Sequence, residues 1–578
     1  MSPAKELVTL AEQSAFKQTG RIDEVERLSA ALAERWPDAV RSFEYGRSVL
    51  NRPLRALIVS RTGALSARDL QSRGIPILML QGGIHPGESD GKDAGFMTLR
   101  DMLSGAVGTG PLEQIAVLFV PAFNTDGHER FGAWNRPNQV GPEAMGWRTT
   151  AQNLNLNRDY MKADAPEMQA MLQLLNEWDP LICSDMHVTD GADFEPDVSI
   201  QVEPIHQGDP SLFESATQLR DRLIDKLATE GSLPLPFYPD LYEIDDPSSG
   251  FLLTVYSPRF STGYYPARNR FTVLVETHSW KDYATRVRVT RNTIVGLAEL
   301  TAAHGRDWLK LVHAADRAGL TAAGKEFVLD FATGWREPTA GVERSQNSSS
   351  TTTTIDFRGY AYKRERSEIS GDLVTTYDPS TPQIWRVPFR KNTSPALVCK
   401  APGRGYIVPA GYAKEIGAKL AFHGISFEPF DAQSIDAQLF RAASVQFSAT
   451  PFEGRMRATL QGEWQTEKID VPSGSLLVPS AQIRVRLLMG LLEPQAPDSL
   501  ASWGFFNGCF EAKEYIEPYV AEQIAREMLQ ADSELAAEFK RKLADAQFAQ
   551  DAAARLQFFL RRHSSWDTRF NLYPVYRI

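Results

Sequence analysis

Runs of apolar residues alternate along the first 300 residues with stretches whose apolar positions recur at helical spacing. Continuous apolar runs are typical of strands buried on both faces of a sheet, and they occupy residues 76–82, 115–124, 180–188 and 271–279. Helical spacing is found at 22–36, 91–103, 164–178, 210–229 and 283–302, and two further strands are expected at 40–46 and 53–61. Strands that alternate with helices predict an α/β fold, in which a mixed, mostly parallel sheet has helices on both faces.

The pattern changes after residue 315. Residues 345–354, SQNSSSTTTT, are a low-complexity polar stretch that indicates an exposed loop or linker. Alternating stretches at 455–464 and 481–490 predict strands, whereas the last 70 residues carry helical periodicity. We therefore expect an α/β domain at 1–315 and an α+β accessory region at 316–578, β-rich at first and then helical.

Composition and charge argue against two classes of partner. The net charge is −10 and the pI about 5.6, whereas nucleic acids and anionic membranes both attract a basic face. No run of about 18 apolar residues could span a membrane. The three cysteines form no CxxC pair, which favours a reducing compartment, and the N-terminal stretch contains no apolar run of signal-peptide type. We expect a cytoplasmic protein that binds neither nucleic acid nor membrane.

The stretch QGGIHPGESDGK, residues 81–92, holds His85 and Glu88 in a glycine-rich loop directly after a predicted buried strand. A zinc ion with one open position usually takes three ligands from His, Glu, Asp or Cys, together with water. His187 ends another predicted strand, and ligand sites of open α/β sheets gather at the carboxyl ends of strands. A His-x-x-Glu pair also occurs by chance, and a strand-end histidine is often only hydrogen-bonded, so the metal hypothesis needs support from elsewhere in the chain.

Four further residues supply that support. Glu276 ends the run TVLV and could act as a general base toward water. Asn157 and Arg158 stand side by side and could hold a carboxylate. Arg148 could stabilise an oxyanion. Each of these residues, taken alone, could equally be a surface or turn residue.

The motifs HPGE, FNTDGHERF, GWR, LNR, DMH and ETH follow one another along the chain. In this order they resemble the motifs of the zinc carboxypeptidase family, the carboxypeptidase A-like metallopeptidases. The resemblance covers residues 40–300, and its longer form is similar to a bacterial branch of unassigned specificity. It implies the α/β fold of that family and one Zn²⁺ per chain, bound by His85, Glu88 and His187.

The resemblance also implies roles in catalysis and substrate binding. Glu276 would activate the water and pass its proton to the leaving amine, and Arg148 would polarise the scissile carbonyl. Asn157 and Arg158 would grip the terminal carboxylate of the substrate. A mobile tyrosine usually closes the pocket in this family. The candidates for it are Tyr264, Tyr265 and, as a weaker choice, Tyr256.

Two features depart from the family pattern. An aspartate that orients a zinc histidine often stands two residues before the substrate-binding asparagine. Here that residue is Asn155, a weaker partner, and Asp185 could take this part instead. Arg268 and Arg270 could favour an acidic substrate side chain, although surface salt bridges are the preferred interpretation. Two histidines that flank the motifs are expected to be structural: His128 and His278.

The prediction is a zinc-dependent metallocarboxypeptidase that hydrolyses the C-terminal peptide bond of peptides. Its partner is a peptide or amide substrate with a free carboxylate. The alternative is a zinc amidase or deacylase of N-acyl amino acids or cell-wall-type peptides on the same scaffold. A non-catalytic protein that recognises C-termini is disfavoured, because Glu276 and the metal ligands are all present. The accessory region could form a homo-oligomer, cover the active site or select substrates.

Overall fold

The central element of the protein is an eight-stranded mixed sheet. The computed structural model describes residues 5–108, 110–333 and 352–578. The strand order is β1-β2-β4-β3-β5-β10-β6-β7. In chain order these strands are β1 (Val40–Arg47), β2 (Pro53–Val59), β3 (Ile77–Gln81), β4 (Ala116–Val120), β5 (Ile182–Val188), β6 (Val198–Glu203), β7 (Pro234–Leu235) and β10 (Phe271–Thr277). Four neighbouring pairs are parallel and three are antiparallel, which confirms the predicted sheet.

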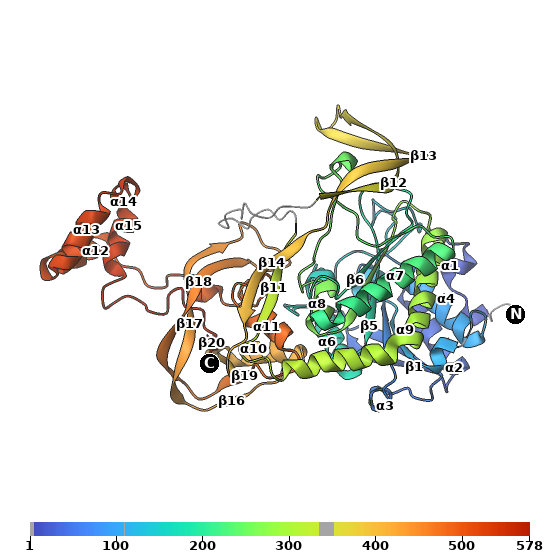
Figure 1. The fold of residues 1–578 in the computed structure, drawn as a ribbon, viewed down its shortest axis with the longest axis horizontal. Coiled ribbons are helices and arrows are strands. Elements are labelled where there is room, and N and C mark those ends of the chain that lie inside the picture. The colour runs from blue at the N-terminus through green and yellow to red at the C-terminus, as the bar shows by residue number, and fades with distance from the viewer. Residues whose placement is uncertain (1–4, 109, 334–351) are drawn as a thin grey trace.

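Helices cover both faces of this sheet because its inner strands are apolar on both sides. In β3, Leu78 and Leu80 belong to one apolar cluster, whereas Ile77 and Met79 belong to another, as expected when side chains alternate between the faces. The helices of the first cluster are α2 (Ile22–Arg35), α4 (Asp90–Ser104), α7 (Phe213–Thr229) and α9 (Tyr283–Gly319). The helices of the α/β part that contribute to the second cluster are α3 (Ala67–Ser72), α6 (Pro166–Trp178) and α8 (Ser261–Ala267). Figure 1 shows this layered part of the molecule.

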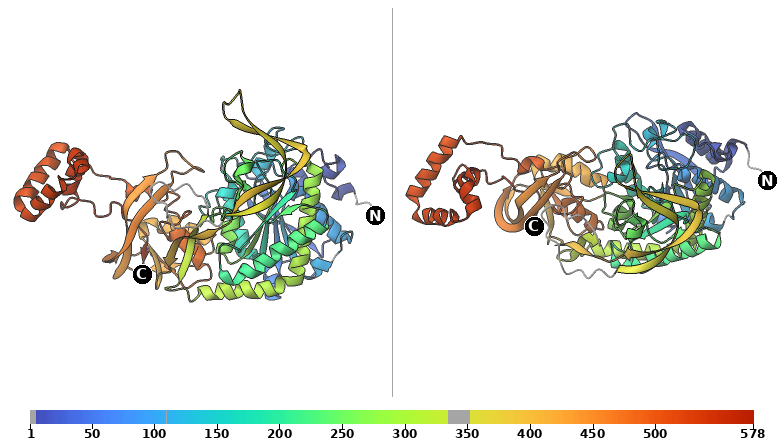
Figure 2. Two further views of the ribbon diagram at one scale, coloured as in Figure 1. Left: turned by 45° about the horizontal axis from the view of Figure 1, so that its top comes forward. Right: turned by 90° about the horizontal axis from the view of Figure 1, so that it is seen from above.

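The helix α9 leads the chain from the α/β part into a second body. It is longer than the predicted helix at 283–302 because Trp308, Val312 and Ala315 remain buried beyond that point. The second body contains a two-stranded sheet, β11-β14, and a six-stranded sheet of order β16-β19-β15-β20-β17-β18. Its elements are β11 (Glu326–Thr333), β14 (Thr393–Lys400), β15 (Gly405–Val408), α10 (Ala410–Phe422), β16 (Glu428–Phe430), β17 (Gln433–Phe447), β18 (Ala458–Val471) and β19 (Ser475–Pro479). Figure 2 shows this body beside the α/β part.

A long hairpin that follows α9 and β11 in the chain packs back against the α/β part. It consists of β12 (Thr352–Arg366) and β13 (Leu373–Arg390) and projects from the molecule in Figure 1. Its strands form a four-stranded sheet with two short strands of the α/β part, β9 (Phe251–Leu252) and β8 (Asp240–Leu241). Of the predicted polar stretch at 345–354, residues 345–351 lie outside the described residues. The last three residues of that stretch begin β12, where the sequence predicts a loop.

One predicted strand is wrong. Residues 481–490 include most of the helix α11 (Val485–Leu492). The alternation in this segment is short, and the Leu-Leu-Met-Gly-Leu-Leu run that follows consists mainly of strong helix formers. Leu487, Leu488 and Leu491 are fully buried, so packing on several sides of the helix stabilises it. The strand predicted at 455–464 is confirmed as part of β18.

The C-terminal segment is helical for most of its length, as predicted. The helices α12 (Pro518–Ala531), α13 (Ser533–Lys542), α14 (Ala546–Gln550) and α15 (Ala552–Leu560) form a group that stands apart from the rest of the molecule in Figure 1. The chain then returns to the six-stranded sheet through β20 (Tyr576–Arg577). No helix in the described ranges is long and apolar enough to cross a membrane.

The accessory region is packed directly against the α/β part. Leu487 of α11 shares one apolar cluster with Met161 and with the residues of α6. Arg455 donates hydrogen bonds to both carboxylate oxygens of Asp164, at 2.7 and 2.9 Å. Both contacts lie close in sequence to the predicted substrate-binding residues, so the accessory region supports the loop that carries them.

Candidate metal centre and substrate pocket

Three strand ends meet at one edge of the central sheet. His85 and Glu88 lie in the loop between β3 and α4, His187 lies near the end of β5, and Glu276 lies near the end of β10. The strands β5 and β10 are parallel, and Glu276 is the register partner of His187. Because the carboxyl ends of parallel strands share one edge, residues that are about 190 positions apart in the sequence face one pocket.

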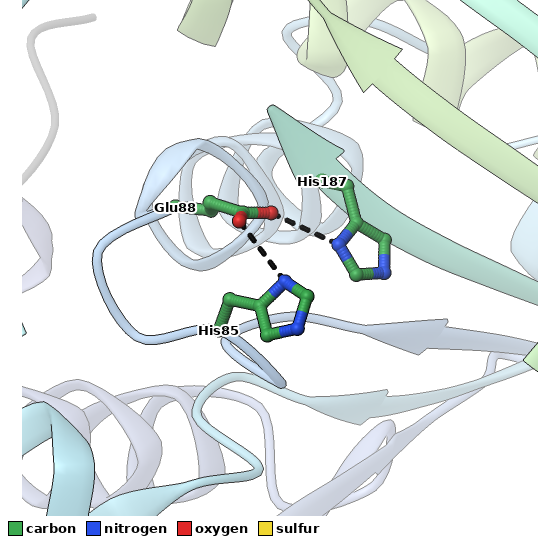
Figure 3. Close-up of side chains that lie close together, drawn as sticks. All are labelled: His85, Glu88 and His187. Carbon is green, nitrogen blue, oxygen red and sulfur yellow. Dashed lines mark hydrogen bonds and ion pairs between the residues drawn. The ribbon is translucent and has the colours of Figure 1, made fainter. Parts of the chain in front are cut away.

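His85, Glu88 and His187 converge on one point, as Figure 3 shows. One oxygen of Glu88 lies 3.0 Å from Nδ1 of His85, and the other lies 2.9 Å from Nδ1 of His187. All three side chains are buried, and one ligand atom from each lies within 4.8 Å of the others. Two imidazoles and one carboxylate with an open fourth position form a ligand set that suits zinc.

The far ring nitrogens of both histidines face side-chain oxygens. Nε2 of His85 lies 3.1 Å from Oδ1 of Asn155, and Nε2 of His187 lies 3.0 Å from Oδ2 of Asp185. Gln81 Nε2 donates a hydrogen bond to Asp185 at 2.8 Å. An acceptor at Nε2 keeps the proton there and leaves Nδ1 free to bind a metal. The residues present therefore fit a zinc ion, and Asn155 and Asp185 both lie where an orienting partner is needed.

The charge states of the ligands depend on this burial. Burial lowers the pKa of His85 to about 4, so its imidazole is neutral near pH 7 and able to bind a metal. Burial alone would raise the pKa of Glu88, but Arg136 and His85 hold it well below the usual value. Burial also lowers the pKa of His187, but Asp185 and Glu88 outweigh this and raise it well above the usual value. A metal on Nδ1 of His187 therefore displaces a proton.

Arg136 is a residue of this centre that the sequence analysis missed. Its guanidinium lies 2.8 Å from Oε1 of Glu88 and donates a hydrogen bond to the backbone oxygen of Val188 at 3.1 Å. It is buried, and Gln139 accepts a hydrogen bond from its Nε. Arg136 lies in a loop without periodicity, and its sequence neighbours Asn135 and Pro137 give no chemical signal, so only the fold reveals it.

Glu276 lies in the wall of the pocket. Burial raises its pKa to about 8, with Glu88 and Asp190 adding to the rise and His187 opposing it. A carboxyl group with a raised pKa is a stronger proton acceptor once it is ionised, which is what a general base requires. A divalent cation on the three ligands would lower this pKa, because opposite charge favours the ionised form.

Asn157, Arg158 and Arg148 form the cationic side of the pocket. Oδ1 of Asn157 is buried and has no hydrogen-bond partner, although buried polar atoms are nearly always paired. Burial, together with the neighbouring Arg148 and Arg259, lowers the pKa of Arg158 to about 10. Two guanidinium groups crowded on one side of the pocket favour an anionic ligand. The amide Nδ2 of Asn157 can also donate to an anion, whereas its unpaired Oδ1 is an acceptor and needs a donor from the ligand.

The pocket has a volume of about 190 Å³ and extends past the metal ligands to a second wall. The residues of this wall are Asp190, Tyr238, Asp240, Tyr256, Phe260, Ser261, Thr262 and Leu274. Tyr256, the weaker tyrosine candidate, donates a hydrogen bond through its hydroxyl to Asp240 at 3.0 Å. The pocket therefore has one cationic side and one side on which tyrosines surround a carboxylate.

The two preferred tyrosine candidates lie elsewhere. Tyr264 and Tyr265 belong to α8 and are buried in the core. The hydroxyl of Tyr264 lies 2.9 Å from Nδ1 of His423 in the accessory region, and the hydroxyl of Tyr265 faces the sulfur of Met79. Neither tyrosine lines the pocket, because the segment that carries them is a helix packed between the sheet and the accessory region.

Arg268 and Arg270 also lie outside the pocket, and they are buried, whereas the sequence analysis preferred surface salt bridges. Arg270 forms ion pairs with Asp179 at 2.5 Å and Asp316 at 2.9 Å. Arg268 donates hydrogen bonds to Asn176 and to the Leu175 backbone oxygen. The two flanking histidines are buried outside the pocket as well, His278 stacked on Phe194 and His128 on Phe131.

Comparisons with known proteins find relatives among the carboxypeptidases. Residues 25–192 match the model of the zinc carboxypeptidase family. Carboxypeptidase 2 of Trichophyton tonsurans is 22% identical over 456 residues, which cover 74% of this chain and 73% of that protein. Carboxypeptidase 2 of Trichophyton rubrum is 23% identical over 456 residues with the same coverage. An alignment that covers 74% of the chain must include residues after position 315, so the similarity extends into the accessory region.

Solved structures show a weaker likeness. The metallo-carboxypeptidase from Burkholderia cenocepacia has a TM-score of 0.34 at 16% identity, over 48% of this chain and 69% of that one. The carboxypeptidase A from Helicoverpa armigera has a TM-score of 0.37 at 14% identity, over 50% of this chain and 74% of that one.

Proposed function

We propose that this chain, whose residues 25–192 match the model of the zinc carboxypeptidase family, is a metallocarboxypeptidase that removes single residues from the C-terminus of peptides. The observation that carries the proposal is a His-Glu-His ligand set that shares one pocket with two arginines and an asparagine. We also propose that residues 1–315 form the catalytic domain and that residues 316–578 form an accessory region.

One zinc ion per chain is the proposed cofactor. His85, Glu88 and His187 would hold it, and Asn155 and Asp185 orient the two imidazoles. The ion supplies a Lewis acid that polarises a carbonyl and lowers the pKa of a water molecule when bound. The open fourth position distinguishes such a catalytic site from a structural one, in which four protein ligands surround the metal.

The terminal carboxylate of the substrate is the proposed ligand of the cationic side. Asn157 and Arg158 offer it an amide and a guanidinium, and Arg148 lines the same pocket with its guanidinium 3.7 Å from Glu88. Charge-assisted hydrogen bonds to a carboxylate are about twice as strong as neutral ones. Recognition of a free carboxylate by this pair would restrict cleavage to the chain end.

Glu276 is the proposed proton carrier. It accepts a proton from the attacking water and returns it to the amine that leaves, so it begins and ends the cycle ionised. Arg148 is the proposed donor to the oxygen on which negative charge develops. Its side chain is 35% exposed and its guanidinium lies 3.7 Å from Glu88, so it can approach a substrate carbonyl next to the metal ligands.

The variant Glu276→Gln tests this assignment. The amide has the shape of the carboxylate but cannot accept the proton, so we expect kcat to fall about a hundredfold to ten-thousandfold. Zinc content, measured by mass spectrometry of the intact protein, should remain one ion per chain. The exposed Glu214→Gln on α7 is the matched control and should keep full activity. An active Glu276→Gln enzyme would refute the proton-transfer role.

The alternative of a zinc amidase or deacylase uses the same groups. A pocket of about 190 Å³ accommodates a single amino-acid moiety, and an N-acyl amino acid presents the same carboxylate and the same carbonyl as a peptide end. Cleavage of N-acyl amino acids without cleavage of peptides, by the wild type and not by Glu276→Gln, would select this alternative.

A further inference from the structure

Among the described residues, two carboxylates of the pocket are joined to no lysine or arginine by an ion pair: Glu276, the proposed proton carrier, and Asp240. Asp240 lies on β8, where Oδ2 accepts hydrogen bonds from Thr254 Oγ1 at 2.9 Å and from the hydroxyl of Tyr256 at 3.0 Å. In the part of the chain that the structure describes, no ion pair joins Asp240 to a lysine or arginine. Its only hydrogen-bond donors there are two neutral hydroxyl groups.

The other three carboxylates of the pocket wall are each accounted for. Glu88 faces the two histidines and Arg136, and Glu276 is the proposed proton carrier. Asp190 lies 3.3 Å from Arg136, and its side chain is 51% exposed. Asp240 is therefore the carboxylate of the wall that a ligand could neutralise.

The cations of the pocket are engaged elsewhere. Arg148 and Arg158 belong to the side that would bind the terminal carboxylate. Arg268 and Arg270, which could have favoured an acidic side chain, are paired inside the core and absent from the pocket wall. An acidic substrate side chain would meet Asp240, and the described residues of the pocket wall would offer it no cation beyond the side that binds the terminal carboxylate. Like charges in a confined site repel each other.

The residues around Asp240 suit a long side chain with a charged end. Tyr238, Tyr256 and Leu274 line the same wall. Aromatic faces attract cations, and apolar surface accommodates the methylene stem of a lysine or arginine. Burial raises the pKa of Asp240, whereas the hydrogen bonds from Thr254 and Tyr256 lower it. A bound cation would favour the ionised form further.

We propose that Asp240 is the specificity residue of this pocket and that it selects peptides whose C-terminal residue is lysine or arginine. This inference rests on the proposed carboxypeptidase function. A neutral side chain of the same length would leave the Asp240 carboxylate desolvated and unpaired, and a site that loses a charged partner in this way discriminates strongly between ligands. Tyr256 acts as the positioning residue, because its hydroxyl fixes one carboxylate oxygen.

The test compares dipeptides that differ only at the C-terminal side chain. Benzoylglycyl-lysine and benzoylglycyl-norleucine have equal carbon chains, and only lysine carries the ammonium group. With the zinc-loaded full chain, kcat/KM should be about tenfold to a hundredfold higher for lysine than for norleucine. Benzoylglycyl-arginine should resemble lysine, and benzoylglycyl-glutamate should be the poorest substrate. A preference for norleucine or glutamate would overturn the inference while leaving the carboxypeptidase function intact.

Two variants separate selection from a structural role. Asp240→Asn should lower the lysine-to-norleucine ratio of kcat/KM by about tenfold to a hundredfold. Asp240→Glu, which keeps the charge, should retain the preference for lysine. If Asp240→Asn lowers kcat/KM equally for the lysine and norleucine substrates, the role of Asp240 is structural and the inference is overturned. The exposed Asp221→Asn on α7 is the control. If the wild type cleaves none of the four dipeptides, the proposed function itself has failed, and this inference fails with it.

Discussion

Asn155 connects the metal centre with the carboxylate-binding side of the pocket. Its Oδ1 lies 3.1 Å from Nε2 of His85 and accepts the backbone N–H of Asn157 at 3.0 Å. The variant Asn155→Ala removes both interactions. Loss of the partner that orients a metal-binding histidine typically costs about 10- to 100-fold in metal affinity, which corresponds to about 1.4–2.8 kcal/mol. We expect the Kd for Zn²⁺ to rise by that factor.

The assay is a competition for Zn²⁺ between the apoprotein and a chelator of known affinity, followed by absorbance at constant pH. Asn155→Asp is the matched control, because it keeps an oxygen at the same place and adds negative charge. Its affinity should equal or exceed that of the wild type. KM of Asn155→Ala should rise as well, since the turn that carries Asn157 loses its cap. An Asn155→Ala protein that binds Zn²⁺ within about twofold of the wild type would refute the orienting role.

Two further predictions concern contacts around the pocket, and a third concerns a buried histidine of the accessory region. Glu453 of the accessory region accepts a hydrogen bond from the backbone N–H of Asn155 at 2.8 Å. The variant Glu453→Ala should therefore raise KM about threefold to tenfold with little change in kcat. An unchanged KM would contradict a role of Glu453 in positioning this loop. Tyr256→Phe removes a hydroxyl that fixes Asp240 and should lower kcat/KM for lysine substrates several-fold more than Tyr264→Phe, whose hydroxyl contacts only the core; equal losses would contradict the assignment. Burial lowers the pKa of His423 to about 3. Because the unfolded chain binds a proton on this histidine near pH 6.5 and the folded chain only near pH 3, the contribution of His423 to the free energy of unfolding is fully present above about pH 6.5. It is lost as the pH falls toward 3. Between pH 7.5 and 5, the free energy of unfolding of the wild type should fall about 1–2 kcal/mol more than that of His423→Gln, measured by urea unfolding, and parallel pH profiles would refute this.

The sequence predicts the central sheet well because its signal is local. Four apolar runs of strand length are separated by helical stretches, and the structure contains strands in all four runs. The residues at the ends of these runs can then be placed together, because parallel strands end at one edge. His187 and Glu276 are register partners for that reason. The exception at 481–490 lies in a short alternating segment where helix and strand patterns overlap.

The remaining parts of the site depend on long-range contacts that no local pattern encodes. Asp240 belongs to a two-residue strand whose sheet is completed by β13, more than 130 residues later. Arg136 reaches Glu88 from an irregular loop. The adjacent pair Tyr264 and Tyr265 resembles a loop motif in the sequence, but the segment folds as α8 and turns both rings into the core.

The proposed function depends on recognition of a free C-terminal carboxylate by Asn157 and Arg158. The most direct measurement follows one peptide that ends in lysine, as the free acid and as the C-terminal amide, by mass spectrometry during incubation with the zinc-loaded protein. The account predicts loss of the single terminal residue from the free acid and no cleavage of the amide. Cleavage of both peptides, or of neither with one zinc bound per chain, would contradict it.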